Sequence, residues 1–146
     1  MTLKQLLAQG RLKEHKTSKK EIADLFKIIK RDISDAEIKI LSPDRRFSTA
    51  YNAVLQTATI VLYCHGYKPS GWGHHFTVFQ AMKIILGKDY EELADYFDSC
   101  RVKRNITDYD RAGEISEKEV KELISEAKRF FKKIENWVER NYPSLK

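Results

Sequence analysis

The segment from Pro43 to His65 is the most apolar part of the chain, and its apolar residues fall on most sides of a helix. One stripe of this segment is widened by neighbouring residues on both sides: Tyr51, Leu55, Ala58, Leu62 and His65, with Ala50, Val54 and Val61. A helix that is apolar on most sides is buried among other helices. Its most apolar part, residues 53–64, is interrupted by polar residues and is too short to span a bilayer. We therefore predict a central helix of a bundle.

Other stretches repeat apolar residues at three- and four-residue steps, which is typical of helices with one buried face. One begins at Ser18 and the last begins at Ser116, each with the spacing of a capping box. Two shorter helices are expected between Gly73 and Asn105, and loops at residues 67–73 and 105–113. Short connections favour antiparallel neighbours. The fold class is therefore predicted as all-α, an up-and-down antiparallel bundle of four to five helices.

The length of 146 residues fits one domain, and 42% hydrophobic with 33% charged residues excludes a disordered chain and a membrane protein. We assign residues 1–146 to a single helical domain. Residues 1–17 carry Leu3, Leu6 and Leu7, followed by a basic run, and we expect them to form a loosely attached N-terminal helix or arm.

The net charge of +6 permits a polyanionic partner, and its excess lies toward the two ends of the chain. Two cysteines, Cys64 and Cys100, form no disulfide framework and are expected to be small buried hydrophobes. No secretory signal is evident, so a cytoplasmic location is expected and no membrane association. No zinc motif and no glycine-rich phosphate loop occurs, so no metal and no cofactor are expected.

An arginine falls where the apolar stripe of the helix after Asp89 predicts a core residue. That stripe is Tyr90, Leu93, Phe97 and Cys100, and one turn further lies Arg104, with Arg101 on the same side. A guanidinium at the inner edge of a bundle is costly unless it is paired or faces a wet cleft. Arginine forks match phosphate oxygens, and tyrosine can stack on a base. The stretch therefore indicates phosphate or base recognition.

The candidate nucleotide- or RNA-binding residues all come from this stretch: Arg101, Lys103, Arg104, Asn105, Asp108 and Tyr109. Arg104 and Tyr109 are the candidate catalytic residues. The alternative is purely structural: Arg104 and Asp108 are spaced as an i,i+4 ion pair, and Tyr109 can anchor the following loop.

Two segments resemble those of HEPN-domain proteins. They are Ala50-Tyr51-Asn52-Ala53 in the apolar helix and Arg104-Asn105 followed by Asp108-Tyr109-Asp110, before a long final amphipathic helix. The similarity covers about residues 18–142. The resemblance implies an all-α bundle that commonly forms homodimers. It also implies two kinds of role, since many members pair with a minimal nucleotidyltransferase in toxin–antitoxin systems and others are endoribonucleases that need no metal.

The ribonuclease members carry an Arg, then Asn, Asp or His, and a His a few residues later. Arg104 and Asn105 match the first part, whereas Tyr109, Asp110 and Arg111 stand where the His is expected. The leading hypothesis is therefore a protein that binds nucleotide or RNA and acts with a nucleotidyltransferase partner. The alternatives are a metal-independent endoribonuclease, using Arg104 with Tyr109 or a His from elsewhere, and a non-catalytic dimerisation module.

The remaining polar candidates are interpreted structurally. For His74 and His75 we favour a helix-start or packing role over a base or a metal ligand, and for His65 a role at its helix end. Asn52 lies on the polar side of the central helix, where it can bond within the bundle or across a dimer interface.

Overall fold

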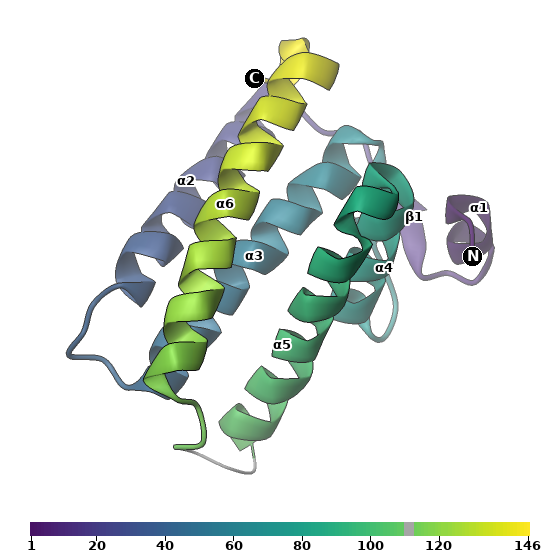
Figure 1. Ribbon diagram of the computed structural model, residues 1–146. Coiled ribbons are helices and arrows are strands. Elements are labelled where there is room, and N and C mark those ends of the chain that lie inside the picture. Colours follow the sequence, from purple (N-terminus) through teal and green to yellow (C-terminus); the bar gives the residue numbers. More distant parts are fainter. Residues whose placement is uncertain (110–112) are drawn as a thin grey trace.

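The computed structural model describes the backbone of residues 1–109 and 113–146, and the side chains of residues 1–105 and 113–146. Its elements in chain order are α1 (Leu3–Ala8), β1 (Leu12–Glu14), α2 (Lys19–Ala36), α3 (Pro43–Cys64), β2 (Tyr67–Pro69), α4 (His74–Leu86), the 3-10 turn η1 (Lys88–Tyr90), α5 (Glu91–Tyr109), α6 (Glu117–Asn141) and the 3-10 turn η2 (Pro143–Leu145). The prediction of an all-α helical bundle is confirmed (Figure 1).

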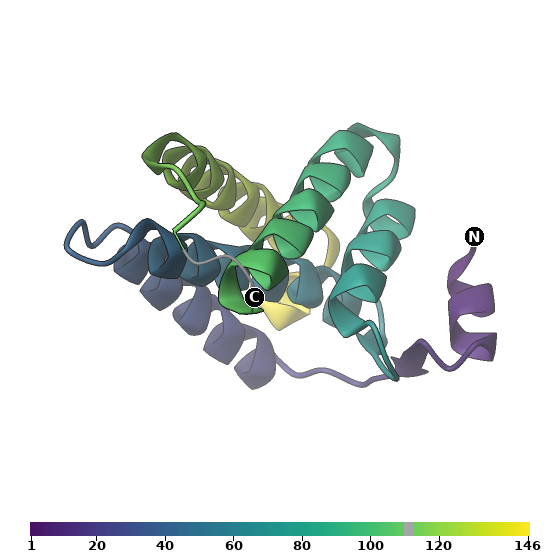
Figure 2. The same cartoon turned by 90° about the horizontal axis from the view of Figure 1, so that it is seen from below.

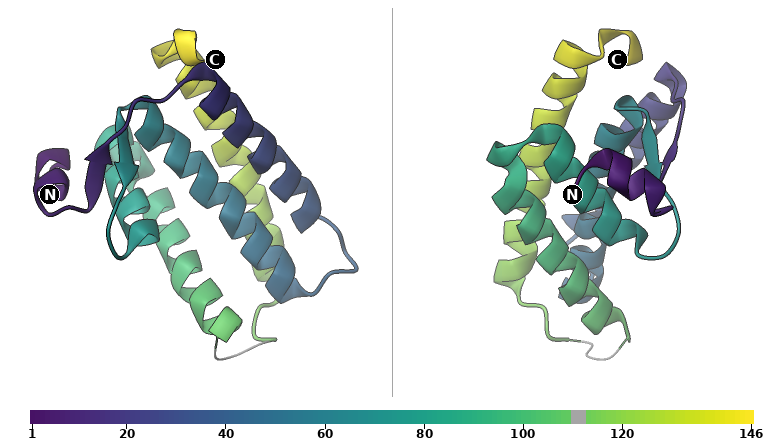
Figure 3. Two further views of the ribbon diagram at one scale, coloured as in Figure 1. Left: turned by 180° about the vertical axis from the view of Figure 1, so that it is seen from behind. Right: turned by 90° about the vertical axis from the view of Figure 1, so that its right-hand side faces the viewer.

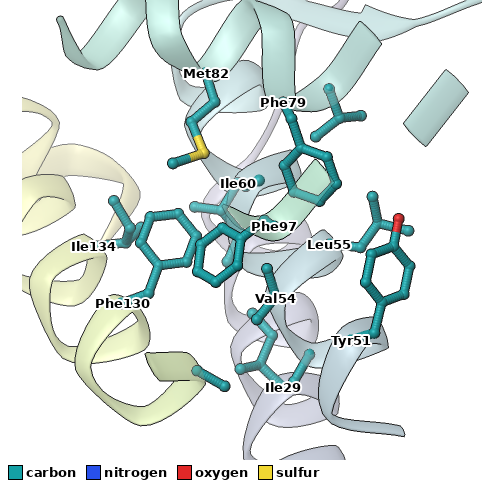
Figure 4. Close-up of a cluster of buried hydrophobic side chains, with 14 of the residues drawn as sticks. Ile29, Tyr51, Val54, Leu55, Ile60, Phe79, Met82, Phe97, Phe130 and Ile134 are labelled. Carbon is teal, nitrogen blue, oxygen red and sulfur yellow. The ribbon is translucent and has the colours of Figure 1, made fainter. Parts of the chain in front are cut away.

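Helix α3 is the centre of the bundle, as its apolar pattern predicts. It packs against α2, α4, α5 and α6 (Figures 1 and 2). Most of its residues are buried. Its partners each contribute one apolar face, and the aromatic rings of Phe97 on α5 and Phe130 on α6 lie 5.1 Å apart in the core beside α3 (Figure 4). Such rings dominate core energetics because each buries a large apolar area.

Helices α2 and α6 begin at residues whose side chains can accept hydrogen bonds from the free backbone N–H groups of the first turn. Ser18 and Ser116 are the N-caps of α2 and α6, and each accepts a hydrogen bond from the backbone N–H three residues on. Ser116 and Glu119 form a full capping box. In α2, the corresponding Glu21 carboxylate is instead hydrogen-bonded to His15 and Thr17. Pro43 occupies the first turn of α3, where it lacks only an N–H that would have no helical partner.

Two local predictions are wrong. The expected loop at residues 67–73 contains β2, which pairs with β1 in a small antiparallel sheet with Lys13 opposite Lys68. The expected loop at residues 105–113 starts later, because α5 continues through Tyr109. Strands of three residues are too short to show an alternating pattern, and the last turn of α5 is too polar to show an apolar stripe.

The N-terminal segment lies at one side of the bundle, beside α4 (Figure 3). Leu6 of α1 and Leu12 of β1 are buried. The backbone N–H of Ser70 donates to the carbonyl of Arg11 at 2.9 Å, and the N–H of His15 donates to the carbonyl of Gly66 at 2.8 Å. These bonds extend the β1–β2 pairing and fix this segment against the connection between α3 and α4.

Candidate functional site

An open pocket of about 390 Å³ lies where the start of α4 meets the last third of α5. Its lining residues are Gly73, His74, His75 and Phe76 from α4 and its cap, and Arg101, Arg104 and Asn105 from α5. Figure 1 shows that α4 and α5 run side by side, which brings these lining residues of the two helices together. The pocket combines two guanidinium groups, two imidazoles and an amide.

Arg104 is half-buried and positioned by α3. Its guanidinium carbon lies 5.4 Å from the centre of the Tyr51 ring, and its Nε lies 3.4 Å from the hydroxyl of Ser48. A cation over an aromatic face is attracted by the ring quadrupole. The aromatic ring supports one face of the guanidinium, which fixes its plane at the pocket wall. This contact brings together the two segments that carry the family resemblance.

Arg101 lies one turn earlier on the same side of α5. Its Nε donates to the carboxylate of Asp98 at 2.7 Å, and its guanidinium carbon lies 5.7 Å from the ring centre of Phe76. Its side chain remains 24% exposed. Asp98 therefore orients one edge of this guanidinium, which has further donors at its other edge.

Tyr51 and His75 form a hydrogen-bonded pair, of which His75 is a lining residue of the pocket. The Tyr51 hydroxyl lies 3.0 Å from Nδ1 of His75. Burial raises the pKa of Tyr51. Burial and the nearby cations Arg104 and Arg101 lower the pKa of His75. At neutral pH both groups are therefore uncharged, whereas Arg101, paired with Asp98, and Arg104 carry fixed positive charges.

The first turn of α4 adds positive potential to the pocket. Its N-cap is Gly73, with a φ of +70° and no side chain to accept from the free N–H groups. The first backbone N–H groups of a helix have no partner within the helix and carry partial positive charge. Together with Arg101 and Arg104 they create an environment suited to an anion.

Of the candidates taken from the sequence, the structure brings Arg101, Arg104 and Asn105 into one pocket. It places Lys103 on another side of α5, where its ammonium group pairs with Glu119 of α6. Asp108 and Tyr109 lie in the last turn of α5, and their side chains lie outside the described part of the chain. Asp110 and Arg111 lie outside the described residues altogether.

Four side chains of this site were not selected as site residues from the sequence: Tyr51, His74, His75 and Phe76. Tyr51 belongs to the segment that carries the resemblance, which is a usable signal. His75 and Phe76 follow Gly73 at the start of a helix. Their spacing in the sequence does not predict that this helix begins beside Arg104, because that depends on how α4 packs against α5. Of the two roles considered for Asn52, the structure shows the one within the bundle, since its amide donates to the buried Asp32 at 2.6 Å.

Other features of the described chain are structural. Cys64 and Cys100 are free and buried, as predicted. A pocket of about 470 Å³ lies between the end of α2 and the start of α3. Its lining contains one cation, Arg45, and two carboxylates, Asp35 and Asp44, so it is not suited to an anion. Within residues 1–109 and 113–146, no helix has the length and hydropathy of a membrane span. The same residues contain no group of three metal-ligating side chains.

The comparisons with known proteins identify the family. A family model described as HEPN_SAV_6107-like HEPN matches residues 38–135, about two thirds of the chain. Neither the curated proteins nor the solved structures yield a match. The matched range begins just before α3 and runs into α6, so it includes Tyr51, the start of α4 and both pocket arginines. The chain therefore belongs to the HEPN-domain family, in its SAV_6107-like branch.

Proposed function

We propose that the pocket between α4 and α5 binds a phosphate group of RNA or of a nucleotide. The observation that carries the proposal is the convergence of Arg101 and Arg104 with the uncapped start of α4 on one pocket. Each guanidinium offers several N–H donors in a plane, which matches the oxygens of a phosphate. A volume of about 390 Å³ is within the range of small-molecule sites.

The half-buried position of Arg104 favours binding over a merely solvated charge. An arginine that lies over Tyr51 and beside Ser48 has lost part of its water shell, and the nearby His75 is uncharged. A phosphate in the pocket would meet this cation at a lining position that is already partly desolvated. Charge-assisted hydrogen bonds to such groups are stronger than those between neutral groups.

The test compares Arg104→Ala with Lys103→Ala. Both changes remove one cation from α5, but only the first removes it from the pocket. Loss of a hydrogen bond to a charged group is worth about 1.5–3 kcal/mol, so we expect Arg104→Ala to weaken RNA or nucleotide binding roughly ten- to a hundred-fold. Lys103→Ala should leave the affinity nearly unchanged. Equal affinities of the Arg104 variant and the unaltered protein would reject the site.

A second function, metal-independent cleavage of RNA, is favoured by one further observation. His75 supplies an uncharged imidazole in the same pocket as Arg104, although the sequence has no His after Arg104-Asn105. In the tautomer that donates Nδ1–H to Tyr51, the other ring nitrogen can accept a proton. It would take the proton of a 2′-hydroxyl, whose oxygen then attacks the phosphorus and forms a cyclic phosphate. The 5′-oxygen of the next nucleotide leaves and takes up a proton.

Cleavage of labelled RNA in the presence of EDTA tests this second function. We expect His75→Ala and Arg104→Ala to abolish cleavage, and Tyr51→Phe to lower its rate by loosening the hold on His75. If the folded protein binds RNA without cutting it, the pocket is a binding site only.

The family assignment supports two broader proposals. HEPN domains commonly dimerise, and we infer a homodimer of this chain. We also infer a nucleotidyltransferase partner in a toxin–antitoxin system, which rests on the resemblance alone. Purification from the native cell tests both: a co-purifying nucleotidyltransferase supports the partnership, and a bare homodimer counts against it.

A further inference from the structure

Trp72 is the most exposed large side chain near the pocket. It is 99% exposed in the connection between β2 and α4, directly before the helix cap Gly73. Tryptophan has the largest apolar surface of any side chain, so a ring without packing contacts is an unusual feature of a folded domain. Its place in the chain is one residue from the pocket lining.

The backbone around Trp72 has a specific conformation and is anchored to the N-terminal segment. Gly71 and Gly73 flank it with φ values of +74° and +70°, a conformation that other residues rarely adopt. A side chain at Gly71 would place its Cβ 3.2 Å from the carbonyl oxygen of Gly10, so the loop lies close against the N-terminal segment. The bond from Ser70 to Arg11 anchors the same loop. The loop that carries Trp72 is therefore tied down just before the exposed ring.

A second exposed ring lies four residues further along the chain. Phe76, on the first turn of α4, is 43% exposed and lines the pocket. It lies between two guanidinium groups, with Arg11 at 5.5 Å and Arg101 at 5.7 Å from its ring centre. Arg11 is itself held by hydrogen bonds to Thr77 and Gln80. The side chains thus alternate aromatic and cationic groups beside the pocket.

We propose that the natural ligand of this pocket is a single-stranded polynucleotide, with a base stacked on Trp72 next to the phosphate held by Arg101 and Arg104. The proposal rests on the phosphate-binding function above. Aromatic rings interleaved with cations are the surface that single strands use, because every base presents a flat face to an exposed ring. Bases in a duplex are already stacked on each other, so the ring selects unpaired nucleotides. Phe76 and Arg11 extend the same surface for a neighbouring nucleotide.

Arg11 contributes to this surface from outside the range that matches the family model. Arg11 lies in the N-terminal segment, whereas the family model begins at residue 38. The phosphate pocket itself is built within the matched range. The N-terminal segment therefore adds to the ligand surface without forming the phosphate site, which suggests a role in selecting the strand.

The first experiment uses tryptophan fluorescence. The chain contains two tryptophans, Trp72 and Trp137. Trp137→Phe leaves Trp72 as the only tryptophan, which can be excited selectively over the tyrosines, and this substitution lies on α6 next to Tyr142, where it keeps an aromatic ring. We expect a single-stranded oligoribonucleotide to quench the Trp72 emission, and an abasic strand of equal length to leave it unchanged. Unchanged emission with bound RNA would overturn the stacking.

The second experiment measures affinity for the same two strands and for a duplex. Stacking is worth about 1–3 kcal/mol per base, so Trp72→Ala should weaken single-strand binding roughly five- to a hundred-fold and leave abasic-strand binding unchanged. Trp72→Tyr should retain most of the affinity. Ile40→Ala is the matched control, because Ile40 is also a large apolar side chain, 91% exposed, but lies between α2 and α3.

The outcomes separate this inference from the function on which it rests. Equal binding of the single strand, the abasic strand and the duplex, insensitive to Trp72→Ala, would overturn the stacking while leaving the phosphate site intact. Failure of all strands to bind, with Arg104→Ala without effect, would reject the phosphate site itself. If Trp72→Ala changes only self-association or the binding of a protein, Trp72 is a protein contact and the inference is wrong.

Discussion

His75 is the residue whose chemistry depends most on its surroundings. Its ring is bonded to the Tyr51 hydroxyl, is partly removed from water, and faces the positive charges of Arg104 and Arg101, with His74 beside it. Each of these effects except the hydrogen bond opposes the gain of a proton. The group is thus suited to remain a neutral hydrogen-bonding partner, or a base, at a site whose cations are fixed.

We predict that His75 titrates below the ordinary value of 6.5. Because its pKa is lowered by folding, the unfolded chain binds this proton first as the pH falls. The contribution of His75 to stability is therefore full above pH 6.5 and is lost as the pH falls toward its lower, folded pKa. NMR titration of the ring gives the pKa, and urea unfolding at several pH values gives the stability.

His75→Gln is the control for this titration. It removes the titrating ring, so the fall in unfolding free energy through this pH window should become smaller than in the unaltered protein. Binding of a phosphate ligand near the ring should raise the pKa of His75, since an anion favours the charged form. A ring that titrates above 6.5 in the free protein would contradict the environment described here.

The sequence carries part of this residue-level information. The apolar stripe places Arg104 at the inner side of its helix, and the structure places it half-buried beside α3, as that pattern implies. The pairing of Tyr51 with His75 joins two helices that are separated by a strand and a glycine-rich loop. Such pairs depend on how helices pack, and no spacing within a single helix encodes them.

At the scale of elements, caps are the most predictable features. A cap is a contact between a side chain and a backbone group three residues away, so its signal lies within one short window. The N-caps Ser18 and Ser116 were both assigned in this way, and the structure confirms them. By contrast, β1 and β2 are stabilised by pairing with each other although they are far apart in the sequence, so no short window predicts them. The end of α5 at Tyr109 was also not predicted, because its last turn consists mostly of polar residues.

We predict that Ser116→Ala lowers the unfolding free energy by about 1 kcal/mol, because it removes the hydroxyl that accepts from the Glu119 N–H. Ser125→Ala, within the same helix, removes an exposed hydroxyl that is not a cap and should change stability by less than about 0.5 kcal/mol. Urea unfolding monitored by circular dichroism gives both values. Equal losses for the two variants would contradict the capping role.

At the scale of the whole molecule, a buried arginine joins three helices at one end of the bundle. Arg46 of α3 is 4% exposed. Its Nε donates to the carbonyl of Ala36 at the end of α2 at 2.8 Å, and its Nη1 donates to both carboxylate oxygens of Glu117 at the start of α6. The sequence gives no sign of this role, since Arg46 follows another arginine in an ordinary charged first turn.

We predict that Arg46→Ala destabilises the protein by about 2–5 kcal/mol, the usual loss when a large buried side chain is cut back to alanine. It leaves a buried carbonyl without its donor and a cavity between helices. Glu117→Gln should cost less, because the Glu117 side chain is 55% exposed and water can replace the lost charge. Chemical denaturation of both variants measures the difference, and the reverse order would show that the exposed ion pair dominates.

The small sheet has a consequence for cooperativity between distant parts of the chain. β1 and β2 are separated by α2 and α3, and a ladder of three residue pairs opens locally at a free energy well below that of global unfolding. Opening releases the arm that carries Arg11 and the loop that lies against Gly10. A ligand that contacts Arg11 binds the closed form more tightly than the open form, so its binding is thermodynamically linked to the closing of the sheet. Occupancy of the site on α5 would then slow the exchange of backbone amide protons in Leu12–Glu14, which lie outside the pocket lining.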